Sequence, residues 1–174
     1  LKKSNVENFV VYDLAEIEYD NKISLGCVSD NFRKDYEMLI PIEKLHRQYF
    51  GKGLADVLSE KDSIEDKINY TVSFIEKITG LENVGEYFSV MLAVDAFFLN
   101  EDRHTNNIAV IRNEKTKNYR LAPIFDNGLS FMCSCTTPEE FTSFDKLKTG
   151  PVNNYIGSRD TLDNVKIVPK SYID

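Results

Sequence analysis

The chain has 174 residues, of which 42% are hydrophobic and 11% aromatic, so it can bury the core of one domain and is not of the disordered class. Its formal net charge of −7 at pH 7 gives no bulk electrostatic basis for direct nucleic-acid binding or for attraction to an anionic membrane. The 3 cysteines and the lack of an apolar run approaching about 20 residues favour a reducing, cytoplasmic location without a membrane span.

The first elements in chain order are a β-hairpin and a short helix. Residues 8 to 29 contain two runs rich in β-forming side chains on either side of a turn, which predicts the hairpin. The stretch from 30 to 41 is polar and mixed, so we expect a loop or linker there. Residues 42 to 50 have amphipathic helical spacing, and Gly51 is placed to end that helix.

Two longer helices and a second hairpin follow. Ser63 can cap a helix whose apolar residues keep helical spacing from 64 to 78, and Gly80 is suited to end it. A further helix is predicted over 82 to 99, and apolar side chains cover so much of its surface that we expect it to be almost fully buried. Strands return as a hairpin over 108 to 125. Because strands and helices occur in separate blocks, the pattern predicts an α+β fold rather than a doubly wound sheet.

A polar loop, "NEDRHTNN" at residues 100 to 107, lies between the last helix and the second hairpin. Asp102 is near its start and Asn107 at its end, while Asp126 closes the hairpin in "IFDNG". If the hairpin folds back on itself, Asp126 returns to the loop. Carboxylate and amide oxygens of the kind that Mg²⁺ prefers would then converge. The sequence therefore predicts a candidate site between loop and hairpin.

The spacing of these residues matches two parts of a protein kinase. Asp102 and Asn107 have the Asp-to-Asn spacing of the catalytic loop, and the Asp-Asn-Gly segment that begins at Asp126 has the form of the metal-binding Asp-x-Gly. Ordinary structural roles remain open for each residue. Asn-Gly is typical of a tight hairpin turn, and a single histidine such as His104 is often a hydrogen-bonded structural residue.

Taken together, "DRHTNNIAV" and "YRLAPIFDNG" resemble the HipA-type serine/threonine kinases of bacterial toxin–antitoxin modules. The Asp-Arg-His-x-x-Asn form is also similar to that of phosphatidylinositol kinase-like enzymes. The resemblance implies a protein-kinase-like fold that uses ATP and Mg²⁺. By position, it implies that Asp102 is the catalytic base, that Asn107 and Asp126 are Mg²⁺ ligands, and that His104 steadies the phosphates.

One further segment carries a weaker resemblance, and one position departs from the family. "ISLGCVSDNF" resembles the strand and hinge between the two kinase lobes, which implies that adenine binds the backbone at Cys27, Val28 and Ser29. HipA itself has a lysine just before the metal-binding asparagine, where this chain has Asn106. Compared with HipA, this loop therefore has one positive charge fewer near the expected position of the ATP phosphates.

The resemblance also divides the chain. Residues 1 to 33 correspond to a hinge-side β-hairpin that is a remnant of the first lobe, and residues 34 to 174 to a mainly helical C-lobe with a catalytic β-hairpin. Within the latter, residues 130 to 154 correspond to an activation-loop-like segment. A phosphate-covering loop and the lysine of a first lobe are not found before Asp102. We therefore expect an incomplete C-lobe with weak or no activity of its own.

The implied reaction transfers the γ-phosphoryl of ATP to a Ser or Thr hydroxyl of a protein substrate, and the resemblance adds an antitoxin as an expected partner. A phosphatidylinositol-kinase-like lipid kinase is an alternative, although the acidic charge disfavours a membrane substrate. A non-catalytic kinase-fold binding module also remains open, but the intact Asp102, Asn107 and Asp126 favour an active site. A metal-dependent phosphohydrolase could use the same residues and would not need the hinge-like hairpin.

Overall fold

Strands and helices occupy separate blocks of the chain in the computed structural model, which describes residues 1, 5–131, 133, 137, 138 and 154. Most of the segment from 130 to 154, interpreted above as activation-loop-like, lies outside the described residues. The mixture of α and β elements agrees with the predicted α+β class. In chain order the elements are β1 (Asp13–Tyr19), β2 (Lys22–Val28), β3 (Glu37–Pro41), α1 (Ile42–Phe50), α2 (Leu54–Ser59), α3 (Ile64–Thr79), α4 (Val84–Phe98), β4 (Ala109–Asn113) and β5 (Tyr119–Leu121).

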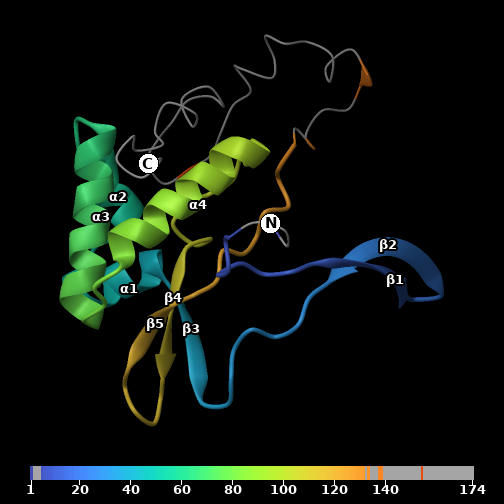
Figure 1. Ribbon diagram of the computed structural model, residues 1–174, viewed down its shortest axis with the longest axis horizontal. Helices are drawn as coiled ribbons and strands as arrows, with labels where there is room; N and C mark the ends of the chain where they lie inside the picture. The colour runs from blue at the N-terminus through green and yellow to red at the C-terminus, as the bar shows by residue number, and fades with distance from the viewer. Residues whose placement is uncertain (2–4, 132, 134–136, 139–153, 155–174) are drawn as a thin grey trace.

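β1 and β2 form the antiparallel hairpin that the sequence predicts over residues 8 to 29. The two residues between the strands, Asp20 and Asn21, have φ of 52° and 57°, the left-handed pair typical of a two-residue hairpin turn. The hairpin projects away from the rest of the molecule (Figure 1), and apolar side chains such as Leu14, 81% exposed, are not covered by it. Turn chemistry, rather than burial, therefore defines this hairpin.

The second sheet is antiparallel and has the strand order β3-β4-β5. β4 and β5 form the second predicted hairpin. The prediction of a loop or linker over residues 30 to 41 is wrong in its last part, because β3 lies there. This strand forms because it pairs with β4, which is distant in sequence, with Leu39 opposite Ile111 and Ile40 opposite Val110. No local pattern in the sequence reports such a pairing.

The ends of the predicted helices follow their residue chemistry. α1 ends at Gly51 and α3 at Gly80, with φ of 71° and 72°, a conformation that glycine adopts without a side-chain clash. Ser63 caps the start of α3, because its side chain accepts a hydrogen bond from the backbone N–H of Asp66. The sequence did not predict α2, whose 6 residues are too few for a periodic pattern to appear.

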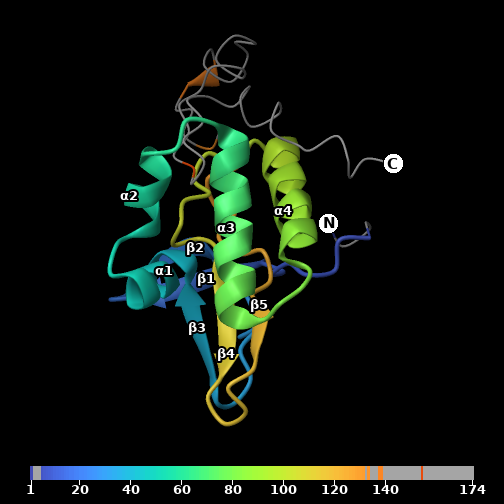
Figure 2. The same ribbon diagram turned by 90° about the vertical axis from the view of Figure 1, so that its left-hand side faces the viewer.

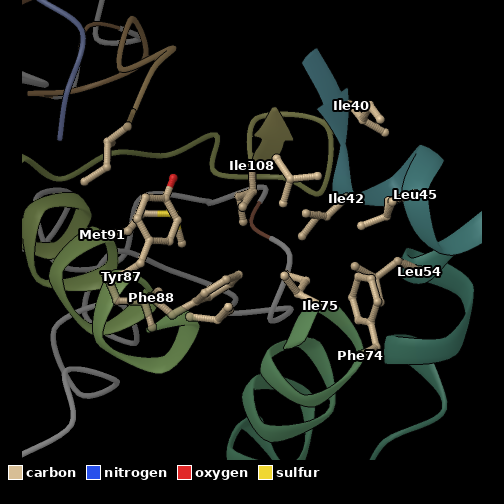
Figure 3. Close-up of a cluster of buried hydrophobic side chains, with 14 of the residues drawn as sticks. Ile40, Ile42, Leu45, Leu54, Phe74, Ile75, Tyr87, Phe88, Met91 and Ile108 are labelled. Atoms are coloured by element: carbon tan, nitrogen blue, oxygen red, sulfur yellow. The ribbon is translucent and has the colours of Figure 1, made fainter. Parts of the chain in front are cut away.

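One main core joins the helices to the second sheet, whose strands extend away from the helical part in both views (Figures 1 and 2). Figure 3 shows side chains of β3 and the helices meeting around Ile75 and Ile108. Ile108 is 1% exposed and directly follows Asn107, so the core anchors the end of the polar loop. Among the described residues, none of the helices has the length and apolar character needed to cross a bilayer.

Candidate functional site

The polar loop at residues 100 to 107 begins where α4 ends and is anchored to α1. Leu99 has a left-handed φ of 52° and turns the chain out of α4. Farther along, Thr105 Oγ1 donates to Glu43 Oε2 at 3.0 Å, and Glu43 N–H donates to Thr105 O at 3.3 Å. Burial raises the pKa of Glu43, but hydrogen bonds, led by that from Ala55 N–H, outweigh burial and lower the pKa overall. Glu43 is therefore an ionised anchor for the loop.

Hydrogen bonds within the loop fold it into tight turns. Asp102 O accepts from His104 N–H and from Asn107 Nδ2, both at 3.0 Å. Asn107 N–H donates to His104 O at 2.8 Å. Because Nδ2 of Asn107 is engaged on the main chain, its amide oxygen is turned away from Asp102 O, and no hydrogen bond between the described residues engages that oxygen.

His104 lies beside Asp102. Its Nδ1 accepts a hydrogen bond from Asn106 N–H at 3.3 Å, so a neutral ring in this arrangement carries its proton on Nε2. Nε2 is 3.7 Å from Asp102 Oδ2, which is an ion-pair distance if the ring is protonated. The two side chains are 31% and 26% exposed, so both can meet a substrate.

The side chain of Arg103 is directed into the protein between these partly exposed residues and is 1% exposed. Its Nε and Nη2 donate to the two carboxylate oxygens of Asp95 on α4, each at 2.9 Å, which makes a bidentate ion pair. Asp95 also accepts from Asn100 Nδ2 at 2.7 Å. Burial lowers the pKa of Arg103, but the hydrogen bonds and charge of Asp95 outweigh burial and raise it overall. The buried guanidinium therefore stays charged.

The same guanidinium joins the loop to the end of the second hairpin. Nη1 of Arg103 donates to Asn107 O at 3.1 Å and to Phe125 O at 2.6 Å. Nη2 donates to Asn127 Oδ1. Because Phe125 and Asn127 flank Asp126, one side chain links the Asn107 end of the loop to both neighbours of Asp126. We call this group the Arg103 bridge, and its members are Asp95, Arg103, Asn107, Phe125 and Asn127.

Asp126 is exposed and has a φ of 54°, a left-handed backbone conformation that is uncommon outside glycine, although Asp adopts it more readily than most residues. Its N–H donates to Tyr12 Oη at 3.2 Å. Arg103 and Asp126 interact electrostatically. Within the described part of the chain, no hydrogen bond or ion pair engages the Asp126 carboxylate, so the carboxylate is available to a ligand.

The donor set of this site suits Mg²⁺. Asn107 offers an amide oxygen and Asp126 a carboxylate, and the Arg103 bridge connects the segments that bear them. The described residues contain no group of His, Cys, Asp or Glu side chains arranged to hold a metal ion by themselves. Mg²⁺ commonly uses one or two protein carboxylates and completes its shell with phosphate and water oxygens. Asn107 and Asp126 fit that pattern.

The residues expected at the adenine-binding hinge lie apart from the polar loop. Cys27 and Val28 end β2, and Ser29 follows them, and all are exposed. No hydrogen bond or ion pair between described residues links any of them to the loop. The chain reaches the second hairpin at Phe32, whose ring centroid is 6.0 Å from that of Phe125. The structure therefore links Asn107 to both neighbours of Asp126 through Arg103, and joins Asp102 and His104 to Asn107 within the loop, but no such contact among the described residues reaches Cys27 to Ser29.

A mainly apolar cavity of about 470 Å³ borders the Asp126 segment. Its walls include Val10 and Tyr12 from the N-terminal segment, Phe98 from α4, and Asn127 and Gly128. Side-chain packing therefore does not fill the space on this side of the residues that follow Asp126.

The sequence analysis missed Asp95, Tyr12 and the role of Arg103. Asp95 interrupts the apolar stretch "VMLAVDAFFL", and a charged residue inside such a helix signals a buried ionic partner. Arg103 stood in the loop motif without an assigned role. Nothing local in the sequence indicates that Tyr12 reaches Asp126, 114 residues away.

No protein-family model and no curated protein matches the sequence. Among solved structures, the chain is similar to the proinflammatory kinase CtkA of Helicobacter pylori, with 23% identity and a TM-score of 0.47. The match covers 70% of this chain and 42% of that kinase, so the chain spans less than half of its length.

Proposed function

We propose that this chain contributes the catalytic loop and the Mg²⁺ ligands of an ATP-dependent kinase that transfers a phosphoryl group to a hydroxyl, with weak activity of its own. The observation that best supports the proposal is the Arg103 bridge, because it joins the Asn107 end of the polar loop to both neighbours of Asp126. A candidate base and two candidate oxygen ligands therefore lie on connected segments. Their order and spacing are those of a kinase catalytic loop followed by a metal-binding aspartate.

In the proposed reaction, Asp102 accepts the proton of the acceptor hydroxyl as the hydroxyl oxygen forms a bond to the γ-phosphorus of ATP. The bond from that phosphorus to the bridging oxygen breaks, and ADP leaves. A positioned base of this kind typically contributes about 10²–10⁴-fold to the rate. His104, whose Nε2 is 3.7 Å from Asp102 Oδ2, would steady the phosphates beside the base.

Asn107 and Asp126 would hold the Mg²⁺ of the nucleotide. When bound, Mg²⁺ would neutralise the charge of the phosphates during transfer. The chain contributes orientation, since Asn107 Nδ2 donates to Asp102 O and so the amide oxygen is fixed by the loop that also bears the base. Cys27, Val28 and Ser29 would bind adenine through their main chain only if the hinge lies closer to the site when ATP is bound.

The finer assignment is a HipA-like protein kinase with a Ser or Thr acceptor on a protein substrate. Its support is the resemblance of "DRHTNNIAV" and "YRLAPIFDNG" to that family. An antitoxin partner, a cytoplasmic location and an activation-loop-like role for residues 130 to 154 belong to the same proposal. A basic surface for lipid headgroups has no support in the net charge of −7, which favours a protein over a lipid substrate.

Calorimetry with ATP in the presence and absence of Mg²⁺, together with phosphoryl transfer to a generic protein, tests the proposal. We expect Asp102→Asn to retain Mg²⁺-dependent ATP affinity but to lose about 10²-fold or more in transfer rate, because it removes the base and no metal ligand. Asp126→Asn should weaken Mg²⁺-dependent ATP binding itself, because it removes the carboxylate from the ion.

Asp20→Asn is the matched control. Asp20 lies at the tip of the β1–β2 hairpin, and asparagine tolerates its φ of 52°, so neither fold nor binding should change. ATP binding that does not depend on Mg²⁺, or full transfer by Asp102→Asn, would contradict the proposal.

A further inference from the structure

The backbone at Asp126 needs restraint from its surroundings. A φ of 54° is disfavoured for a residue with a side chain, and such conformations persist where neighbouring interactions define them. Packing supplies little on one side, since the cavity of about 470 Å³ borders Asn127 and Gly128. The direction of the Asp126 carboxylate therefore depends on the hydrogen bonds of residues 125 to 127.

Two side chains supply these hydrogen bonds from different parts of the fold. Arg103 donates to Phe125 O at 2.6 Å and to Asn127 Oδ1, and so holds the residues on either side of Asp126. The remaining bond is that of Asp126 N–H itself, which donates to Tyr12 Oη at 3.2 Å. Among the described residues, the bond to Tyr12 is the only one of these hydrogen bonds whose partner lies on the N-terminal side of β1.

The N-terminal segment is held in register with the hairpin just before Asp126. Val10 N–H donates to Ile124 O, and Ile124 N–H donates to Asn8 O, both at 2.8 Å. Phe9 and Ile124 form a parallel β-bridge. A shift of this segment would therefore move Tyr12 relative to Asp126.

We propose that Tyr12 is a positioning residue for Asp126, and that its hydroxyl couples the N-terminal segment to Mg²⁺-nucleotide binding. The expected effect on Mg²⁺-nucleotide binding rests on the proposed function, whereas the hydrogen bond between Tyr12 and Asp126 does not. Tyr12 does not touch the metal or substrate. Its hydroxyl accepts the hydrogen bond of Asp126 N–H and so restrains the backbone conformation from which the Asp126 carboxylate projects.

Tyr12→Phe tests this directly, because it removes one hydroxyl from a side chain that is 43% exposed and so should not affect folding. Amide hydrogen exchange measured by NMR at Asp126 should become faster by about two- to ten-fold, the range expected for the loss of one hydrogen bond. The Mg²⁺ concentration at the midpoint of ATP binding should rise by a similar factor. Tyr19→Phe, at an 82% exposed tyrosine at the end of β1, should change neither quantity.

Asp126→Asn separates failure of this inference from failure of the proposed function. If Asp126→Asn weakens Mg²⁺-dependent ATP binding and Tyr12→Phe does not, the coupling is wrong while the proposed function stands. If neither variant changes the Mg²⁺ dependence, both are wrong. Unchanged exchange at Asp126 in Tyr12→Phe rejects the positioning role whatever the binding data show.

Discussion

Arg103 shows how a charged residue can be buried beside a site that faces solvent. Removing a guanidinium from water is costly, and the cost is offset only when its donors are all engaged and its charge is paired. Asp95 supplies the pair through two hydrogen bonds, and the carbonyl oxygens of Asn107 and Phe125 accept others. The residue therefore joins α4, the loop and the hairpin, which no apolar side chain of its size could do with the same directional specificity.

Arg103→Ala should destabilise the protein by about 3–5 kcal/mol, because it leaves Asp95 buried without its partner. Urea unfolding followed by circular dichroism measures the loss. Arg47→Ala is the matched control, since Arg47 is 63% exposed in its side chain and pairs with Glu43 four residues earlier on α1. Its loss should be below about 1 kcal/mol.

A double-mutant cycle distinguishes the ion pair from simple packing. Asp95→Asn combined with Arg103→Ala should cost less than the sum of the two single changes, because each single change leaves a buried group without its charged partner. Additive losses would mean that the two side chains act independently, contrary to their bidentate contact.

At the scale of elements, β3 is tied to β5 and to the preceding segment by one ion pair. Arg120 Nε and Nη2 donate to the Glu37 carboxylate at 3.0 and 2.7 Å, and Nη2 also donates to Phe32 O at 2.9 Å. The hydrogen bonds from Arg120 hold the pKa of Glu37 at about 2, below its ordinary 4.5. The folded protein thus favours ionised Glu37.

The sign of the pH effect follows from that lowered pKa. The contribution of ionised Glu37 to folding is complete above pH 4.5 and is lost as pH falls through about 2. Urea-unfolding midpoints measured from neutral pH down to about 2 should therefore fall less steeply over this window in Glu37→Gln than in the unchanged protein. Glu18→Gln, on exposed β1, should leave the slope unaltered. If the unfolding midpoint fell equally steeply with pH in the unchanged protein, Glu37→Gln and Glu18→Gln, the ion pair of Glu37 with Arg120 would not contribute to folding.

Elements differ in how far local sequence predicts them. The start and end of α3 could be predicted because Ser63 and Gly80 act on the residues next to them. β3 could not, because Leu39 is in a strand only by virtue of pairing with Ile111, and the preceding residues are polar. Likewise α2 is too short to show a period. What the sequence lacks is the long-range pairing that selects one local conformation over another.

The same limit applies to the candidate site of the whole molecule. Asp102 and Asn107 could be selected because their spacing lies within one loop, and Asp126 because a hairpin returns the chain. Their roles stay predictions. Arg103 lies within the motif, but the partners that give it a role come from α4 and from the end of the second hairpin. Only a folded chain brings those segments together.

The main core connects every element that positions the site, so damage to it should affect the whole molecule. Phe88 is 1% exposed and packs in the cluster that includes Ile75 and Ile108 (Figure 3). Phe88→Ala should cost about 3–5 kcal/mol, because it leaves a cavity that the surrounding side chains refill only in part. Phe97→Ala on the same helix is the control, since Phe97 is 78% exposed, and it should cost less than about 1 kcal/mol.

The shared core also predicts how the chain unfolds. Because α4 and the second sheet meet in one cluster, helix loss measured by circular dichroism and loss of the folded amide signals of β4 measured by NMR should follow one urea transition. Phe88→Ala should move both curves to lower urea by the same amount, and Phe97→Ala should move neither. If Phe88→Ala shifted the helix signal while the β4 amide signals kept their midpoint, the sheet would fold independently of α4. The Arg103 bridge would then span two separately stable parts, and α4 could not fix the position of Asp126 through it.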